Sequence, residues 1–200
     1  MFSYSCVKNE FHTYTLWNED KSTCMKIVPE RGGIVNQFKV NNQDILYRDD
    51  ESVYDHKAII RAGIPILFPI CGNLDNDTYN VEGRKYSIKN HGFSRDFPWK
   101  VEDIWIKEQE ASIVISQESN QDTLKVFPFK YKLIYKYTLK SDALEIEATF
   151  INSDNVSFDF YAGFHPYFYI PDKEKVNLSI LSESVVDTLG DGYIDNSLNF

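Results

Sequence analysis

The 200-residue sequence predicts an all-β fold, an antiparallel β-sandwich. Short runs of alternating apolar and polar residues recur at about ten-residue spacing with turn-forming residues between them, which is typical of sandwiches and barrels. No stretch keeps the 3.6-residue apolar period of a long helix. The length suits one domain, residues 1–200, which can bury roughly 70% of the surface of its unfolded chain.

The first sixty residues show this spacing. Turn-forming residues gather at 18–21, 30–33 and 41–43, and they separate apolar segments that are short enough to be strands. Residues 49–58 are where we expect a short helical turn.

Two hairpins are predicted in the middle of the chain. Residues 105–118 form the first, with a turn near Gln109 and Glu110. Residues 127–139 and 144–150 form the second, because apolar side chains alternate with lysines in the first run and with glutamates in the second. We interpret this lysine and glutamate surface as a solvated sheet face and not as a functional site.

Three short motifs place charged residues among apolar and aromatic neighbours. They are residues 61–72 (RAGIPILFPICG), 90–95 (NHGFSR) and 162–168 (AGFHPYF). An unpaired charge in apolar surroundings costs free energy, so we expect Arg61, His91, Arg95 and His165 to surround a ligand. The pattern suits a polar small molecule that is neutral or anionic.

The third motif predicts where its histidine lies. Alternation along 158–165 predicts a strand with one aromatic face, and Asp159 and His165 share the other face. Pro166 has no N–H to donate, so His165 should end the strand, where binding residues tend to collect. The alternative is a histidine satisfied by a single hydrogen bond at a sheet edge.

Arginine is rare in this chain, which contains five, and two of the five lie in the motifs. A guanidinium group matches phosphate oxygens in pairs, so Arg61 and Arg95 are candidates for holding a phosphate. The alternative is structural ion pairing, of Arg61 with Asp49, Asp50 or Asp55 and of Arg95 with Asp96. Aromatic residues near the motifs are either core residues or a platform for a sugar ring: Phe68, Phe93, Trp99 and Tyr167.

Composition excludes several classes of partner. The net charge of −9 and a pI near 4.9 argue against nucleic acid or an anionic membrane surface. The three cysteines form no CxxC pair, which offers no zinc framework and is typical of a reducing compartment. The sequence shows no signal-peptide pattern and no apolar run near the roughly 20 residues that span a bilayer. We therefore expect a cytoplasmic protein without a membrane partner.

The three motifs, in this order, resemble the galactose mutarotase-like (aldose 1-epimerase) family. The resemblance is greatest to its branch related to hexose-6-phosphate mutarotases, and it covers roughly residues 20–175. Ala62 stands where that branch usually has glycine, and Ser94 stands where it usually has alanine. Both are exchanges of one small residue for another.

The resemblance implies a galactose mutarotase-like sandwich that interconverts the α and β anomers of a hexose or hexose 6-phosphate. His165 resembles the catalytic acid, and His91 resembles the substrate-binding histidine. Arg61 and Arg95 resemble the arginines that grip substrate, and we add Tyr167 and Asp159 as candidate substrate-binding residues. No metal or organic cofactor is implied.

One residue that the resemblance implies is missing. The general base of the family is a glutamate on a late strand, which is expected beyond Phe200, so the chain is expected to lack the family's C-terminal strands. Asp159 shares a predicted face with His165 and is the substitute base that the sequence offers. The alternative function is a carbohydrate-binding or sensor module that lacks the base and does not catalyse.

Overall fold

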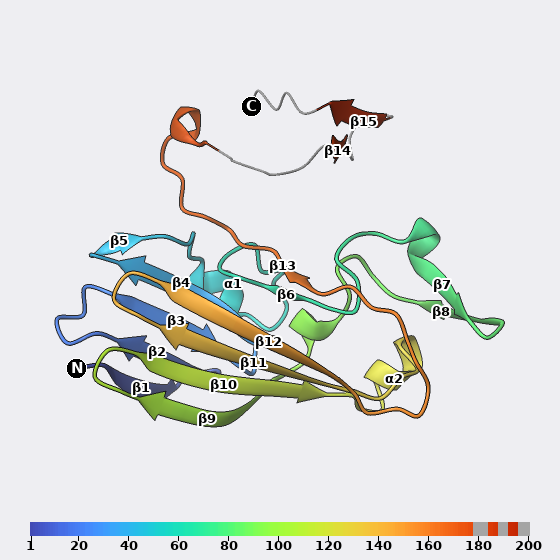
Figure 1. The fold of residues 1–200 in the computed structure, drawn as a ribbon, viewed down its shortest axis with the longest axis horizontal. Helices are drawn as coiled ribbons and strands as arrows, with labels where there is room; N and C mark the ends of the chain where they lie inside the picture. Colours follow the sequence, from blue (N-terminus) through green and yellow to red (C-terminus); the bar gives the residue numbers. More distant parts are fainter. Residues whose placement is uncertain (178–183, 188–191, 196–200) are drawn as a thin grey trace. The chain divides into compact units, whose positions relative to one another are not determined.

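The computed structural model describes residues 1–177, 184–187 and 192–195 (Figure 1). Antiparallel strands dominate it, as the sequence predicts. The chain separates into two compact units, Met1–Tyr169 and Ile170–Phe200. The first unit contains all three motifs. The assignment of residues 1–200 to one domain stays a prediction.

The first half of unit 1 forms a five-stranded sheet whose strands follow each other in chain order. Its members are β1 (Ser3–Lys8), β2 (His12–Trp17), β3 (Cys24–Val28), β4 (Ile34–Val40) and β5 (Gln43–Asp44). The turns predicted at 18–21 and 30–33 lie between these strands, and of the turn predicted at 41–43 residues 41 and 42 do, because Gln43 already belongs to β5. The helical turn predicted within 49–58 is α1 (Asp50–Tyr54), and the side chain of Asp49 caps it by accepting from the Ser52 N–H at 3.1 Å.

The second sheet has four strands in the order β12-β11-β10-β9. They are β9 (Lys100–Ile106), β10 (Ala111–Glu118), β11 (Tyr131–Leu139) and β12 (Leu144–Asn152). Both predicted hairpins are confirmed. The facing charges also pair as expected, since Lys136 contacts Glu147 at 2.6 Å and Lys140 contacts Glu145 at 2.5 Å.

The strand predicted from residue 127 begins only at Tyr131. Residues 127–130 follow the short helix α2 (Thr123–Val126) and are not part of the ladder. Phe127 and Phe129 pack instead in an aromatic cluster with Phe158. The ring of Phe158 stacks on that of Phe129 with a centroid distance of 4.9 Å. Alternation alone does not show where backbone pairing starts.

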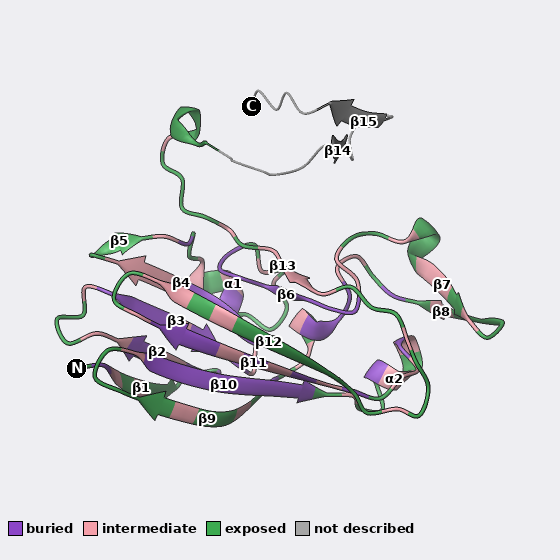
Figure 2. Cartoon of the chain, viewed as in Figure 1, coloured by how far each residue is buried: buried purple, intermediate pink, exposed green. Residues whose placement is uncertain are grey.

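The inner faces of the two sheets share one hydrophobic core, which makes unit 1 a sandwich (Figure 2). The first sheet contributes Leu16, Met25 and Ile27, and the second contributes Ile113 and Tyr137 among others. Burying each such side chain stabilises the fold by about 1.5–3 kcal/mol before entropy is counted. Burial also raises the pKa of Tyr137 well above its usual value.

Shorter elements connect the two sheets and continue the chain. They are β6 (Ile66–Leu67), η1 (Asp75–Asp77), β7 (Thr78–Val81), β8 (Arg84–Ser87), η2 (Ser94–Asp96), β13 (Gly163–Phe164), η3 (Lys173–Lys175), β14 (Ser184–Asp187) and β15 (Gly192–Asp195). In unit 2, β14 pairs with β15. None of the helices in the described part of the chain is long and apolar enough to cross a membrane.

The strand predicted over 158–165 is much shorter than the pattern indicates. Only Gly163 and Phe164 pair, with the two residues of β6, and 158–162 has no strand partner. The predicted aromatic face still packs against other rings. The ring centroids of Phe160 and Phe150 are 5.0 Å apart, and those of Phe164 and Tyr135 are 5.6 Å apart. Aromatic packing, not a ladder, produces the alternation here.

Candidate functional site

The three sequence motifs lie side by side, with the first motif in the middle. Strand β6 of the first motif pairs with β13 of the third, and Phe68, just after β6, forms a parallel bridge with Gly92 of the second (Figure 1). Backbone hydrogen bonds tie the second motif more tightly, because Phe93 and Ser94 both donate to the Phe68 carbonyl, at 3.0 and 3.2 Å. Pairing therefore brings together segments that are about 100 residues apart.

Gly92 explains why the second motif needs its glycine. Its φ is +73°, and a Cβ there would lie 2.1 Å from the Phe68 carbonyl oxygen. Any side chain would therefore push the second motif away from the first. His91, next to it, also has a positive φ of +68°, which is uncommon for a residue other than glycine. Such a conformation persists only where the surrounding bonds hold it.

His91 and His165 face each other. Their ring centroids are 5.3 Å apart and the rings are inclined by 73°. The His91 Nδ1 lies 2.8 Å from the Cys71 carbonyl oxygen, which can only accept, so Nδ1 carries a proton and, in the neutral imidazole, Nε2 is an acceptor. Both side chains are half-buried. In this pair, a backbone carbonyl orients Nδ1 of His91. Nε2 of His91 and both ring nitrogens of His165 are available to a ligand.

His165 follows directly after β13, as the sequence predicts, and its backbone N–H donates to the Pro65 carbonyl at 3.0 Å. The structure gives its ring no hydrogen bond within the described residues. The ring instead stacks on Tyr167 with centroids 4.9 Å apart and planes inclined by 24°. An imidazole held by stacking, with free nitrogens, can exchange a proton with a bound molecule.

Tyr167 is held by the backbone of the first motif. Its N–H donates to the Gly63 carbonyl at 2.8 Å, and its carbonyl accepts from Tyr47 at 2.8 Å. It is half-buried, whereas Phe68, Phe93 and Trp99 are buried in the core. Of the four aromatic residues considered as a sugar platform, Tyr167 is the one that lies beside the histidine pair.

Arg61 makes no ion pair with the acidic residues proposed as its structural partners. Asp50 is bound by Arg48 instead, and this guanidinium lowers the pKa of the Asp50 carboxyl. Within the part of the chain that the structure describes, the Arg61 side chain is exposed and has no hydrogen bond. The ion-pair alternative for Arg61 is therefore wrong, and its guanidinium is free for a ligand.

Arg95 lies in η2 and is positioned by a second tight approach. A Cβ on Gly32, in the turn between β3 and β4, would lie 2.0 Å from the Arg95 carbonyl oxygen, so only glycine fits there. The Arg95 Nη2 donates to the Asn90 carbonyl at 3.1 Å, which closes the second motif on itself. The structure shows no ion pair between Arg95 and Asp96, so that alternative is also wrong.

Asp159 makes no hydrogen bond with His91 or His165 in the structure. It is exposed and borders a small apolar cavity of about 120 Å³ lined also by Pro69, Ile70, Tyr79 and Tyr161, and neither histidine belongs to that lining. The shared face predicted for Asp159 and His165 requires a continuous strand over 158–165, which does not form. Its roles as substrate ligand or substitute base stay predictions, with no geometric support from this structure.

Asn90 is a residue that the sequence interpretation missed. Its side-chain oxygen Oδ1 is buried and has no hydrogen-bond partner among the described residues. A buried polar atom without a partner is uncommon, and it is often explained by a missing ligand or water. The available signal was its place directly before His91 in the second motif. In the described ranges, no group of three or more His, Cys, Asp or Glu side chains is arranged to hold a metal ion.

Comparison with known proteins supports the family resemblance that the three motifs indicate. Residues 12–193 match the family model named Aldose 1-epimerase. The chromosomal LacX protein of Lactococcus lactis subsp. lactis is 31% identical over 148 residues, which are 70% of this chain and 46% of LacX. The chain thus spans about half the length of this curated relative.

Solved structures show the same fold. The Slr1438 protein of Synechocystis sp. PCC 6803 is 34% identical, has a TM-score of 0.90 and matches over 97% of this chain and 68% of its own. A galactose mutarotase related enzyme from Lactobacillus acidophilus is 25% identical, has a TM-score of 0.64 and matches over 88% of this chain and 52% of its own. The fold predicted by the resemblance, a galactose mutarotase-like β-sandwich, is thereby confirmed. On the match to the family model, the chain belongs to the aldose 1-epimerase family.

Proposed function

We propose that this protein is an aldose 1-epimerase that interconverts the α and β anomers of a hexose or hexose 6-phosphate. The observation that supports it most is the facing pair of His91 and His165, whose rings lie 5.3 Å apart at the meeting point of three motifs. In this pair, His91 is oriented by the backbone and His165 has free ring nitrogens. The two histidines can therefore take different roles.

In the proposed reaction, His165 donates a proton to the ring oxygen of the sugar while a base removes the proton of the C1 hydroxyl. The ring opens, the new carbonyl group rotates, and the ring closes with the two roles exchanged. Imidazole suits the acid role because its usual pKa of about 6.5 allows it to lose and regain a proton near neutrality.

Binding roles follow from the same geometry. His91 Nε2 is an acceptor for a sugar hydroxyl, since its Nδ1 proton is committed to the Cys71 carbonyl at 2.8 Å. The buried Asn90 Oδ1 can accept from a second hydroxyl. Tyr167, stacked on His165, holds that ring in place and borders the sugar. Arg61 has an unpaired guanidinium for a hydroxyl or a phosphate.

The general base decides between this function and its alternative. The resemblance assigns that role to a glutamate, and no carboxylate in the described part of the chain is hydrogen-bonded to His91 or His165. Without such a base, the same residues would form a carbohydrate-binding or sensor module that recognises the sugar without catalysis, which is the second candidate. The two candidates differ in turnover and not in binding.

Anomer exchange of glucose and glucose 6-phosphate, measured by magnetisation-exchange NMR, tests both candidates. We expect His165→Ala to lower the rate by about 10²–10⁴, the usual contribution of a general acid. A control at His12, which pairs with Glu30 at 2.8 Å in the sheet of β1 to β5, should keep the rate when changed to glutamine.

A His165→Ala protein that keeps the full rate would contradict the assignment of the acid. Sugar binding without any exchange, in the wild-type protein, would contradict the epimerase and support the sensor module.

A further inference from the structure

Gln117 of β10 is a buried polar residue that has no part in the proposed reaction. Its side chain is 4% exposed and reaches from the second sheet to the segment just after His91. Its Nε2 donates to the carbonyls of Ser94 and Phe97, at 3.0 and 3.3 Å. Its Oε1 accepts from the hydroxyl groups of Ser94 and Tyr131, at 3.0 and 3.4 Å. A carboxamide has two N–H groups and two acceptor lone pairs, so the full hydrogen-bonding capacity of this side chain is used.

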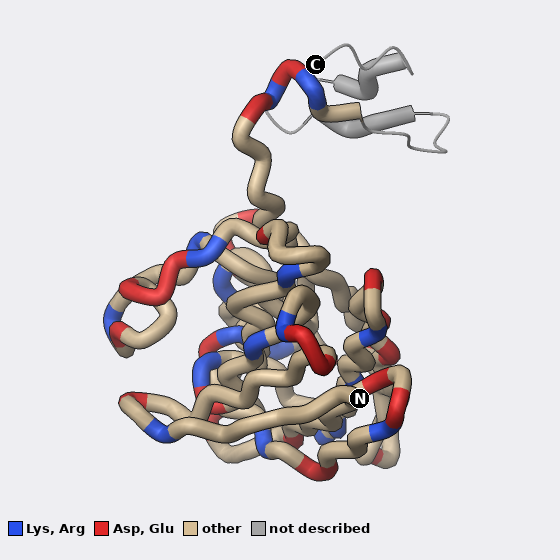
Figure 3. Tube along the Cα trace, turned by 90° about the vertical axis from the view of Figure 1, so that its left-hand side faces the viewer, with Lys and Arg blue, Asp and Glu red and all other residues tan. Residues whose placement is uncertain are grey.

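The groups around this amide are buried and neutral. Ser94, Trp99 and Tyr131 are each at most 3% exposed, and burial raises the pKa of the Tyr131 hydroxyl, which therefore stays protonated. Trp99 Nε1 also donates to the Ser94 carbonyl at 3.2 Å. Acidic and basic residues are interspersed along the chain (Figure 3), but no charged side chain of the described residues joins this group of hydrogen bonds. A satisfied polar network rigidifies the segments that it joins, and this one does so at any pH where histidine titrates.

The segment that Gln117 binds contains the strained residue of the site. His91 has a φ of +68°, and such a conformation persists only where surrounding bonds hold it. The first motif holds His91 itself, because the His91 N–H donates to the Gly72 carbonyl at 3.2 Å and its Nδ1 to the Cys71 carbonyl at 2.8 Å. Gln117 instead fixes the backbone three residues later, at Ser94. The strained residue is thus held on both sides, by the first motif and by the second sheet.

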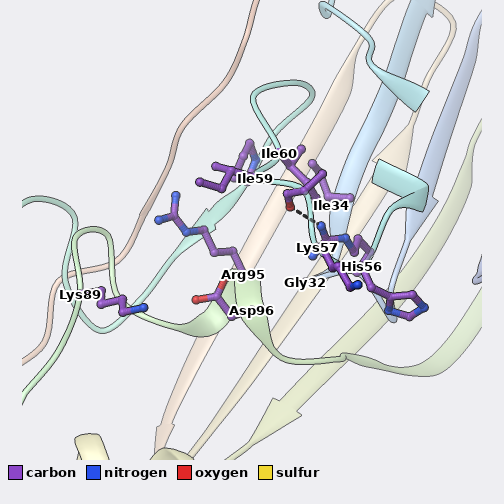
Figure 4. A pocket seen from close by; sticks show the side chains of 12 residues that line it. Gly32, Ile34, His56, Lys57, Ile59, Ile60, Lys89, Arg95 and Asp96 are labelled. Carbon is purple, nitrogen blue, oxygen red and sulfur yellow. Dashed lines mark hydrogen bonds between the residues drawn. The ribbon is translucent and has the colours of Figure 1, made fainter. Parts of the chain in front are cut away.

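The same segment also carries Arg95. The helical turn η2 begins at Ser94, whose carbonyl and hydroxyl are both bonded to Gln117. Arg95 belongs to the lining of a cavity of about 400 Å³, and Figure 4 shows its side chain between Lys89 on one side and the segment with Ile59 on the other. A shift of η2 would therefore move both candidate binding residues of the second motif.

We propose that Gln117 is a positioning residue, which fixes the second motif so that His91 and Arg95 meet the sugar in the geometry that binding requires. The inference rests on the proposed function for the identity of the ligand. Gln117 does not contact the sugar, and it acts through the carbonyls of Ser94 and Phe97. A displaced binding group weakens the bound substrate and the transition state alike, so loss of Gln117 should raise KM and leave kcat nearly unchanged.

Gln117→Met, which replaces the amide by a thioether of similar size, tests the inference through the kinetics of anomer exchange over a range of glucose concentrations. The change removes both bonds to the backbone carbonyls. We expect KM to rise by about tenfold, which corresponds to the loss of one well-placed hydrogen bond to the sugar, and kcat to change by less than about threefold. A merely structural role predicts the reverse, because a smaller folded fraction lowers the apparent kcat and leaves KM unchanged.

NMR of the imidazole rings supplies a readout that needs neither sugar nor turnover. The chain has four histidines, and the His91 ring carries a proton on Nδ1, bonded to the Cys71 carbonyl. In Gln117→Met we expect the ring ¹⁵N and ¹H signals of His91 to shift toward the Nε2–H tautomer, because the bond to Cys71 loosens when the motif moves. The signals of His12 and His56, which lie outside the three motifs, should not move.

Gln37→Met is the matched control. Gln37 of β4 is also buried, at 8% exposed, and its amide donates to Asp44 at 3.1 Å and not to any of the three motifs. We expect this variant to have a lower Tm with an unchanged KM and unchanged His91 signals. Ser94→Ala is a milder second variant, since it removes only the hydroxyl bond to Gln117 and keeps both amide donors. It should shift the same His91 signals and raise KM by about threefold.

Unchanged His91 signals in both Gln117→Met and Ser94→Ala would overturn the inference, whatever the activity. A loss confined to kcat would also overturn it, and so would an equal rise of KM in Gln37→Met. If Gln117→Met does not fold, Ser94→Ala decides by the same two measurements. Shifted His91 signals in a protein that shows no anomer exchange would contradict the proposed function and still support the positioning of His91, so the two failures are separate results.

Discussion

Strands β11 and β12 carry the same alternating pattern and yet differ in burial (Figure 2). Tyr135 of β11 is 1% exposed, whereas Phe150 of β12 is 38% exposed, although their rings lie 6.1 Å apart on the same inner face. Strand β11 has a neighbour on each side, and β12 is the outer strand of its sheet. Alternation thus identifies the face of a side chain, while neighbouring strands and the covering layer decide how far it is buried.

The largest loss of stability is expected for Tyr135→Ala, which tests this comparison directly. The change removes a fully buried ring whose centroid lies 5.2 Å from that of Trp99, so we expect it to lower the free energy of unfolding by about 3–5 kcal/mol. Phe150→Ala on the outer strand is the matched variant and should cost only about 1–2 kcal/mol. Urea denaturation followed by fluorescence measures both. Equal losses would show that the outer strand is as well covered as its neighbour.

Two glycines with positive φ provide a comparison between the motif region and the outlying β7–β8 hairpin. Gly92 has a φ of +73°, and a Cβ added to it would overlap the Phe68 carbonyl. Gly83 has a φ of +80°, and a Cβ added to it would meet only open space. We expect Gly83→Ala to cost about 1–2 kcal/mol from backbone strain alone. Gly92→Ala should cost about 3 kcal/mol or more, because the clash adds to the strain.

Gly92→Ala should also disturb the site, since it forces the second motif away from the first. We expect a folded Gly92→Ala protein to lose sugar binding measured by calorimetry, and Gly83→Ala to retain it. Similar losses of stability in the two variants would mean that the contact between the motifs is loose.

The smallest effect is expected at the polar periphery, where Asp50 accepts from Arg48 and Asn36, each at 2.7 Å. Its folded-state pKa lies below the usual value, chiefly because of the hydrogen bond from Arg48. A lowered carboxyl pKa contributes stability above its unfolded value of about 3.9, and this contribution is lost as the pH falls through the folded pKa. The pair is partly exposed, so we expect less than about 1 kcal/mol.

Comparison of wild type with Asp50→Asn by urea denaturation between pH 6 and pH 3 measures this term. The stability difference should be present at pH 6 and should shrink below about pH 4. A difference that stays constant over the whole range would assign it to packing and not to charge.

Much of the fold could be predicted because its signals are local. The alternation in 131–139 and 144–150 and the turns at 18–21 and 30–33 are properties of adjacent residues, and the structure contains the strands and turns that they predict. The order of three motifs was enough to predict the family and its fold. These inferences succeed because side-chain direction in a strand depends on neighbours two positions away.

The candidate site could be predicted only in part. Pro166 is a local signal that predicts the end of a strand at His165, and in the structure β13 ends one residue earlier, at Phe164. The predicted face shared by Asp159 and His165 fails, because a strand exists only where another strand supplies hydrogen bonds, and β6 offers just two residues. Asn90 was missed for a related reason, since an unpartnered buried atom becomes visible only after the surrounding atoms are placed.

The sequence by itself determined the fold class and the family, and it supplied candidate site residues in three motifs. The tertiary structure alone decided which of them meet: His91 lies beside His165, and Tyr167 stacks on His165. The physical reason is the range of the interactions. Alternation and turn formation act over a few residues, whereas the site depends on backbone pairing between segments about 100 residues apart, whose register no local pattern specifies.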